Sequence, residues 1–258
     1  MLTDSNATTH SNDQLAMHFL AVRQGVGLLG LILPTVLLIY AGGASDRMQP
    51  TISDFYYTAM GDVFVGIVIA IGVFLISYKG HAERPQRFRL GDFETSLIAG
   101  TAAIFVALFP TSFAGDTNLC LDTTNDTIAA CGTEPGTTIL TGLLYIAGPV
   151  HLIAAAVFFL CLAYFCLVLF PMGGKRTVDG QAAWSFEHVV YWAAGWTILA
   201  CILAIIAIFV FGDGALPIAN PIFWAEAVAV YAFAAVWLVK GKMLTRPLGL
   251  RLPGMSAT

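Results

Sequence analysis

The chain has 258 residues, of which 58% are hydrophobic and only 11% are charged. Soluble proteins carry roughly 25% charged residues, so this composition excludes an ordinary soluble protein and predicts one whose main solvent is lipid. The net charge of -4 gives no sign of a nucleic-acid-binding surface.

Six stretches of the chain are long and apolar enough to predict membrane-spanning helices, since a helix needs about 20 mostly apolar residues to cross the hydrocarbon layer. In chain order they are residues 24–45, 63–78, 95–115, a span within 135–174, 189–212 and about 220–239. We therefore expect an all-α fold, a polytopic transmembrane helix bundle with six spans. Splitting the fourth stretch to give seven spans is the alternative, but no charged link interrupts it.

Signals at the helix ends predict where the transmembrane domain begins and how it is bounded. The sequence from Ser11 to Gln14 has the spacing of a capping box and predicts the start of the first helix. Asn220 before Pro221 predicts the start of the sixth. We expect a single domain over residues 14–242, between a mobile cytoplasmic tail at 1–13 and a second cytoplasmic tail at 243–258.

The positive charges of the chain lie on one side of the predicted bundle. Every lysine and arginine except Arg47 falls at an end or link on that side, and these residues are Arg23, Lys79, Arg84, Arg87, Arg89, Lys175, Arg176, Lys240, Lys242, Arg246 and Arg251. Because basic residues are retained on the cytoplasmic side, both termini are predicted to be cytoplasmic, in a multi-pass protein of a bacterial inner membrane. Arg47 is the exception, and we expect it to pair with a nearby acid or to contact an anionic headgroup outside.

Two of the five cysteines fall in the longest predicted external loop, residues 116–136. An oxidising exterior favours a disulfide between Cys120 and Cys131. Closing this loop would stabilise it by about 3 kcal/mol in the chain-entropy model. The remaining cysteines, Cys161, Cys166 and Cys201, fall inside predicted spans, where a free thiol usually serves as a small packing residue.

A few polar residues near the outer membrane boundary are the candidates for a binding site. Counted along their helices, Asp62, His151 and Glu226 fall at similar depths, and an ionisable group inside a bilayer is a candidate functional residue by default. Pro149 lacks an amide donor and leaves the carbonyl of Tyr145 without its helical partner. These features predict a wet outer pocket, to which nearby polar and aromatic residues would contribute, namely Asp54, Tyr56, Tyr57, Trp224 and Arg47.

Each of these residues also has a purely structural interpretation. The two carboxylates fall near helix N-termini, which favour negative charge. Tyrosine and tryptophan are common at membrane boundaries, and a single histidine can hydrogen-bond a neighbouring helix. We favour the structural interpretation for any one residue and the binding site for the group.

Several segments resemble a group of uncharacterised bacterial six-helix inner-membrane proteins that are DRAM-like in layout. The segments are ISDFYYTAMGDVFVGIVIAIGVFLISY, VALFPTSF, PVHLIAAAVFFLCLAYF and FWAEAVAVYAFAAVWLVKGK, and they cover much of the chain. The resemblance implies a fold and a compartment but no activity. A second comparison, with ceramidase-like intramembrane hydrolases, implies clustered zinc-binding histidines, whereas His151 is the only histidine in a predicted span.

The first functional hypothesis is a membrane protein whose outer-leaflet polar pocket binds a lipid, a small solute or a partner protein. Its expected partners are membrane lipids and a possible membrane protein, with no nucleic acid, no cofactor and no metal. The alternative is a membrane-embedded, possibly metal-dependent lipid hydrolase using His151, Asp62 and Glu226 as ligands or as acid and base. A transporter is the second alternative, although the middles of the predicted spans carry few polar residues.

Overall fold

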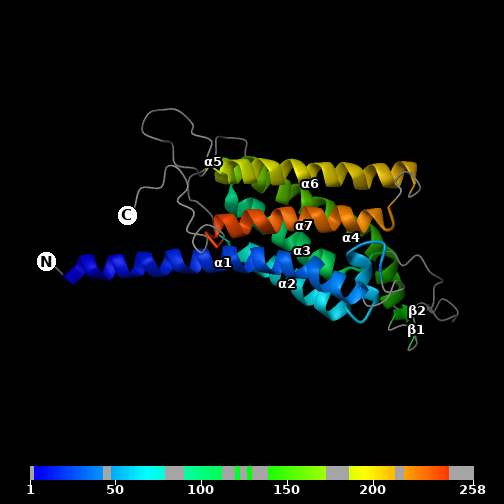
Figure 1. Ribbon diagram of the computed structural model, residues 1–258. Coiled ribbons are helices and arrows are strands. Elements are labelled where there is room, and N and C mark those ends of the chain that lie inside the picture. Colours follow the sequence, from blue (N-terminus) through cyan, green and yellow to red (C-terminus); the bar gives the residue numbers. More distant parts are fainter. Residues whose placement is uncertain are drawn as a thin grey trace.

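Helices running side by side in one bundle make up most of the protein (Figure 1). The computed structural model describes residues 3–42, 48–78, 90–111, 120–122, 127–129, 139–172, 186–212 and 218–243. Side chains are described from residue 20 to residue 111 within those ranges, and again from residue 147. One short antiparallel ribbon pairs β1 (Cys120–Asp122) with β2 (Thr127–Ala129).

The described helices are α1 (Thr3–Ala41), α2 (Gly61–Ser77), α3 (Asp92–Leu108), α4 (Ile139–Tyr164), α6 (Phe186–Phe211) and α7 (Pro221–Lys240). α4 continues through a π-helical segment, η3 (Phe165–Leu169), into α5 (Phe170–Met172). Between α1 and α2 lies the short 3-10 helix η2 (Ser53–Tyr57). We name the two ends of the bundle the η2 end and the Lys240 end.

Four of the helices are long and apolar enough to cross a membrane, and these spans are Leu20–Ala41, Ala147–Met172, Phe186–Phe211 and Pro221–Lys240. α2 is also apolar but shorter, with 17 residues, and α3 has the same length. Large apolar side chains of α6 face outward, and Leu203 and Phe211 are 66% and 77% exposed. Extensive exposed apolar surface suits contact with lipid. The expected all-α helical bundle is confirmed, and four of its helices have the length and apolar composition of membrane spans.

The N-terminal part of the chain differs from the sequence prediction. Residues 3–13, predicted as a mobile tail, are helical, and α1 runs without interruption from Thr3 to Ala41 over 39 residues. The predicted helix start at Ser11 is therefore wrong. Residues 3–24 contain no glycine or proline, so nothing in this segment stops the apolar helix from extending toward the N-terminus. In Figure 1, the N-terminal end of α1 extends to the left beyond the other helices.

Small residues bring pairs of helices into close contact. A Cβ atom at Gly72 of α2 would lie 2.8 Å from the carbonyl oxygen of Gly100 in α3. A Cβ at Gly27 of α1 would lie 2.8 Å from the side chain of Leu238 in α7. Glycine at such contacts lets helix backbones approach closely, which is a common source of affinity between helices in lipid. These glycine contacts pack α2 against α3 and α1 against α7.

Two clusters of buried side chains fill the bundle. The cluster toward the Lys240 end is aromatic, and its largest fully buried member is Trp237. The cluster toward the η2 end includes Leu37 of α1, Phe64 of α2 and Phe223 of α7, together with Phe55 of η2. The loop that carries η2 therefore belongs to the core and positions the polar residues around it.

Candidate functional site

η2 is inserted into the end of the bundle. Phe55 is fully buried, and its ring centroid lies 5.8 Å from that of Phe223 and 6.3 Å from that of Tyr40. Ile52 and Tyr57 are buried beside it. Burying such side chains stabilises the loop by roughly 1.5–3 kcal/mol each. Part of the volume in which the sequence predicts a wet pocket is therefore filled by η2.

Glu226 binds the chain just before η2. Its Oε2 accepts a hydrogen bond from the backbone N–H of Ile52 at 2.7 Å. One turn earlier in α7, the N–H of Phe223 donates to the carbonyl of Pro50 at 2.9 Å. The first N–H groups of a helix have no partner within it, so the loop supplies the acceptor that α7 lacks. These bonds fix the position of the loop on the first turns of α7.

Asp54 and Tyr57 connect η2 to the segment after α3. The hydroxyl of Thr111 donates to Oδ1 of Asp54 at 2.8 Å. The phenol of Tyr57 donates to the backbone carbonyl of Thr111 at 2.6 Å. Burial, with smaller contributions from neighbouring Tyr56 and Asp54, raises the pKa of Tyr57 to about 12. The phenol therefore stays neutral and able to donate at ordinary pH.

His151 of α4 hydrogen-bonds the C-terminal end of α3. The imidazole is buried, and its Nδ1 lies 2.7 Å from the carbonyl oxygen of Phe109 and 3.1 Å from that of Val106. Pro110 follows, and proline has no N–H to donate. Because both partners of Nδ1 are acceptors, Nδ1 must carry the proton in the neutral ring, which leaves a lone pair on Nε2. The histidine thus satisfies free carbonyls and also retains a basic atom.

The structure brings some of the predicted site residues together and separates others. Asp54 lies close enough to both His151 and Glu226 to interact with them electrostatically. Asp62 is exposed in the first turn of α2, and none of the described hydrogen bonds joins it to this group. Trp224 is 43% exposed and packs edge-on against Phe223.

The remaining predictions concern residues at the edge of the site or beyond the described chain. Tyr56 is half-buried, and its ring centroid lies 5.2 Å from that of Tyr57. Arg47 lies outside the described residues, as does Cys131, so the disulfide with Cys120 stays a prediction. Cys161, Cys166 and Cys201, predicted to be packing residues, are free thiols.

Sequence reasoning missed Thr111, although it binds both Asp54 and Tyr57. Thr111 is in the quoted segment VALFPTSF, directly after Pro110. A proline that ends a helix, followed by a residue with a hydroxyl group, was the available signal. That signal gives the end of α3 but does not indicate which loop the hydroxyl meets.

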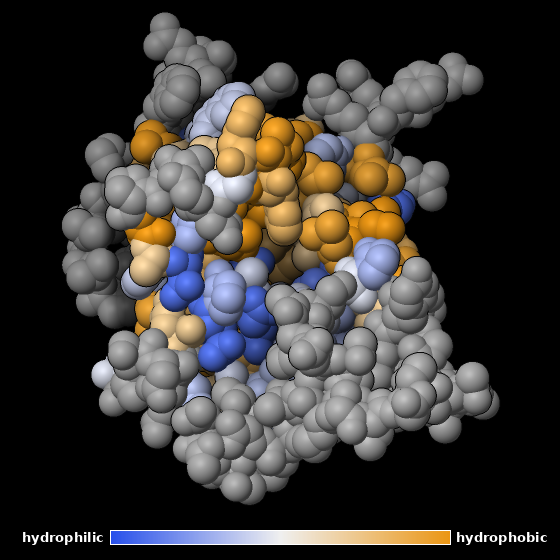
Figure 2. Space-filling model, turned by 90° about the vertical axis from the view of Figure 1, so that its right-hand side faces the viewer, coloured by the Kyte–Doolittle hydropathy of each residue, from blue (hydrophilic) through white to orange (hydrophobic). Residues whose placement is uncertain are grey.

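The surface of the η2 end is divided between polar and apolar side chains. Figure 2 looks onto this end and shows a gathering of hydrophilic residues beside a hydrophobic area, with a hollow between the two. Among the described polar residues on this side are Asp54 and Thr51, which are half-buried, and Asp62, which is exposed. Such a boundary between polar and apolar surface suits a molecule that itself has a polar and an apolar part.

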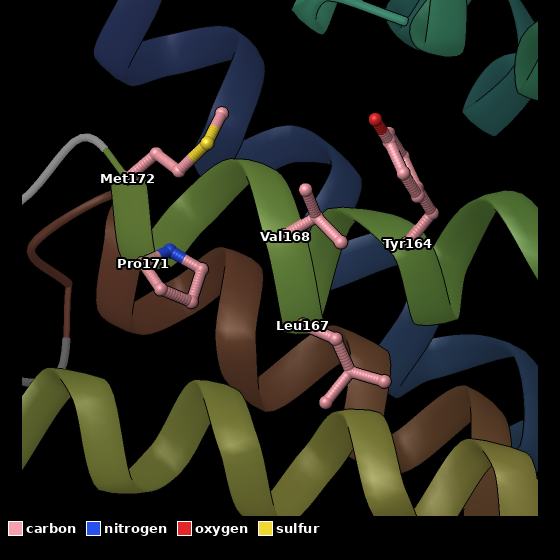
Figure 3. A pocket seen from close by; sticks show the side chains of 5 residues that line it. All are labelled: Tyr164, Leu167, Val168, Pro171 and Met172. Carbon is pink, nitrogen blue, oxygen red and sulfur yellow. The ribbon is translucent and has the colours of Figure 1, made fainter. Parts of the chain in front are cut away.

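A cavity of about 420 Å³ lies elsewhere, against η3 and α5. Figure 3 shows its lining side chains, with Tyr164 and Met172 projecting to the same side of this segment, and the full set is Tyr164, Leu167, Val168, Pro171 and Met172. The phenol of Tyr164 donates to the carbonyl of Leu90 at 3.1 Å. None of the residues predicted for the site lines this cavity, so it is separate from the polar group around η2.

The polar group at the η2 end offers acceptors and one basic nitrogen. Within the described part of the chain, no group of three or more histidine, cysteine, aspartate or glutamate side chains is arranged to hold a metal ion. What the group can do is accept hydrogen bonds from a cationic or donor-bearing ligand. Comparison with known proteins does not extend this: no family model, no curated protein and no solved structure matches the chain.

Proposed function

We propose that the protein crosses the inner membrane of a bacterial cell six times, with both termini in the cytoplasm and the η2 end outside. The distribution of basic residues supports this orientation. The described cations Arg23, Lys240 and Lys242 all belong to the Lys240 end, whereas Asp54, Asp62 and Glu226 belong to the η2 end. In this proposal α2 and α3 are the short second and third spans.

We further propose that the η2 end binds the amine-bearing headgroup of a lipid or similar amphiphile. The observation that carries this proposal is the convergence of Glu226, Asp54 and His151, from three different elements, around η2. Among the described residues, the hydrogen bonds to the two carboxylates reach one oxygen of each, Glu226 Oε2 and Asp54 Oδ1. The second oxygens accept no hydrogen bond from the described part of the chain. An ammonium group has only donors to offer, so it could bind there.

The surface beside this acidic group fits an amphiphile better than a fully soluble ligand. The hydrophilic area in Figure 2 borders directly on hydrophobic residues. A headgroup could bind on the polar side while its chains remain against the apolar side and the surrounding bilayer. An amine headgroup would also provide the positive charge that the described residues of this end lack.

Photocrosslinking with a phosphatidylethanolamine probe tests this proposal. The full chain is reconstituted in phosphatidylcholine nanodiscs containing a small fraction of the probe, and labelling is compared between wild type and the variants Glu226→Gln and Asp54→Asn. Both variants replace an ionisable carboxyl group by an amide but keep an oxygen that can accept the existing hydrogen bond. We expect each to reduce labelling severalfold, since hydrogen bonds to charged groups are worth about 1.5–3 kcal/mol.

Asp62→Asn is the matched control, because it removes the same charge from an exposed position on α2. Its labelling should equal that of wild type. Equal labelling of all variants would overturn the proposal. Equal loss in all three would point to general attraction by the negative surface rather than to a site around η2.

A further inference from the structure

Two cations meet at the Lys240 end against a group of aromatic rings. Lys240 Nζ lies 5.1 Å from the ring centroid of Phe170 and 5.5 Å from that of Tyr191. Arg23 Cζ lies 5.5 Å from the ring centroid of Tyr78, and its Nη2 donates to the Tyr78 hydroxyl at 3.3 Å. The two cations are near enough to repel each other electrostatically.

The rings form one continuous cluster that holds the cations in place. Trp237 is fully buried at its centre, with ring centroids 5.1 Å from Tyr78 and 5.4 Å from Phe170. Phe170 in turn contacts Tyr191 at 5.6 Å. Trp237 and Lys240 are three residues apart on α7, so they lie on the same side of the helix. Arg23, Trp237 and Lys240 thus face a common region.

Two buried hydrogen-bond donors in this region have no partner among the described residues. Arg23 Nε and Trp237 Nε1 are buried, and neither donates to any atom of the described chain. Lys240 Nζ makes contacts to rings but has no hydrogen bond or ion pair with a described residue. Leaving a buried donor unsatisfied costs about 1–3 kcal/mol, and more for a charged group. Asp92 and Glu187 attract Lys240 electrostatically.

The donors and cations of the Lys240 end would be satisfied by a ligand that provides both hydrogen-bond acceptors and negative charge. A phosphate group has both, since its oxygens accept from guanidinium, ammonium and indole N–H groups alike. Arg23 and Lys240 are each only partly buried, so such a group could reach them without opening the aromatic cluster. This is also the side on which basic residues gather, where anionic lipids are attracted to a membrane protein.

We infer that the Lys240 end contains a phosphate-binding site in which the partly buried Arg23 and Lys240 contact the phosphate oxygens. The phosphate belongs to an anionic lipid headgroup or to a free phosphate ion, and both present the same acceptor oxygens. This site is independent of the η2 end, and the failure of either proposal leaves the other standing.

Native mass spectrometry of the full chain released from nanodiscs tests the site and separates its two possible ligands. One arm uses phosphatidylcholine with a small fraction of phosphatidylglycerol and counts retained phosphatidylglycerol. The other adds inorganic phosphate to the chain in detergent and measures the shift in melting temperature. Retention of phosphatidylglycerol alone identifies a lipid site, and stabilisation by phosphate identifies a site that also takes the free ion.

Lys240→Gln and Arg23→Gln should each weaken retention or stabilisation about tenfold, as expected for loss of one charge-assisted hydrogen bond. Lys242→Gln is the matched control, because Lys242 is exposed two residues further along. It should behave as wild type, whereas general attraction to an anionic surface would respond equally to both lysines. Equal effects of Lys240→Gln and Lys242→Gln, or no retention and no stabilisation in wild type, would overturn the inference.

Melting curves in phosphatidylcholine alone show whether each variant still folds. If Lys240→Gln unfolds, Arg23→Gln and the wild-type response to the two ligands still decide the question. A variant that melts as wild type in phosphatidylcholine but loses the added stability with phosphatidylglycerol would support a binding role over a structural one.

Discussion

Gly100 of α3 faces Gly72 of α2, and we expect one added methyl group at Gly100 to destabilise the bundle. A Cβ at residue 100 would lie 2.5 Å from the Gly72 carbonyl oxygen and 2.9 Å from the backbone nitrogen of Ile76. Ordinary contact begins at 3.4 Å, so the two backbones would have to separate by about 0.9 Å where they cross. Overpacking of a well-packed interior costs about 1–3 kcal/mol.

Gly66→Ala is the matched control for Gly100→Ala. Gly66 is also helical, on α2, but a Cβ there would meet nothing within 4 Å. Both substitutions carry the same gain in helix propensity, up to about 1 kcal/mol. The difference between their free energies of unfolding therefore isolates the packing cost, and we expect about 1–3 kcal/mol.

The assay is unfolding of each purified chain in maltoside micelles by increasing mole fractions of dodecyl sulfate, followed by far-ultraviolet circular dichroism. Gly100→Ala should unfold at a lower mole fraction than wild type, and Gly66→Ala at the same or a higher one. If the two variants unfold together, α2 and α3 do not approach closely at Gly72 and the reasoning is refuted.

Substitutions at Glu226, Thr111 and Tyr57 examine the η2 end. Glu226→Leu leaves the Ile52 N–H without an acceptor and should lower the free energy of unfolding by about 1–3 kcal/mol. Glu226→Gln should cost less, because its amide oxygen still accepts this hydrogen bond. Equal losses for the two variants in dodecyl sulfate unfolding would contradict this. Thr111→Val should lower the free energy of unfolding by about 0.5–1.5 kcal/mol. When Asp54→Ala is already present, the same substitution should cost much less, because the lost hydrogen bond joins these two side chains. Since burial raises the pKa of Tyr57 to about 12, the stability it contributes is complete below about pH 10 and is lost as the pH rises from there through about 12. Tyr57→Phe should flatten the dependence of melting temperature on pH in that window, and an unchanged slope would show that this phenol does not cause it.

Much of the helical architecture could be predicted from charge-free stretches alone. Each predicted span overlaps one described helix, and α7 begins at Pro221 after Asn220, as the sequence indicates. The predicted cap is only partly right, because the side chain of Asn220 makes no capping hydrogen bond. The start of α1 was missed because a capping-box pattern at Ser11 competes with a long segment that has no helix breaker.

The candidate site was harder to predict, because depth along a helix axis is easier to estimate than direction around it. Counting residues places Asp62 and Glu226 at similar depths, but Glu226 turns toward η2 whereas Asp62 is exposed. The partner of Glu226 is the backbone N–H of Ile52, 174 residues away. A backbone partner leaves no signature in the sequence, and the insertion of η2 depends on Phe55 fitting between helices that are distant in the chain.

The contact between α1 and α7 has a consequence for the order in which this protein matures. α1 is synthesised early, but the neighbour that packs against Gly27 emerges only with Leu238. The N–H of Ile52 likewise waits for Glu226. Until α7 has been synthesised, α1 therefore lacks its packing partner at Gly27 and the loop that carries η2 lacks its bond to Glu226. Partly assembled chains of this kind are the ones most exposed to misassembly and degradation, so the last described helix acts as the closing step of biogenesis.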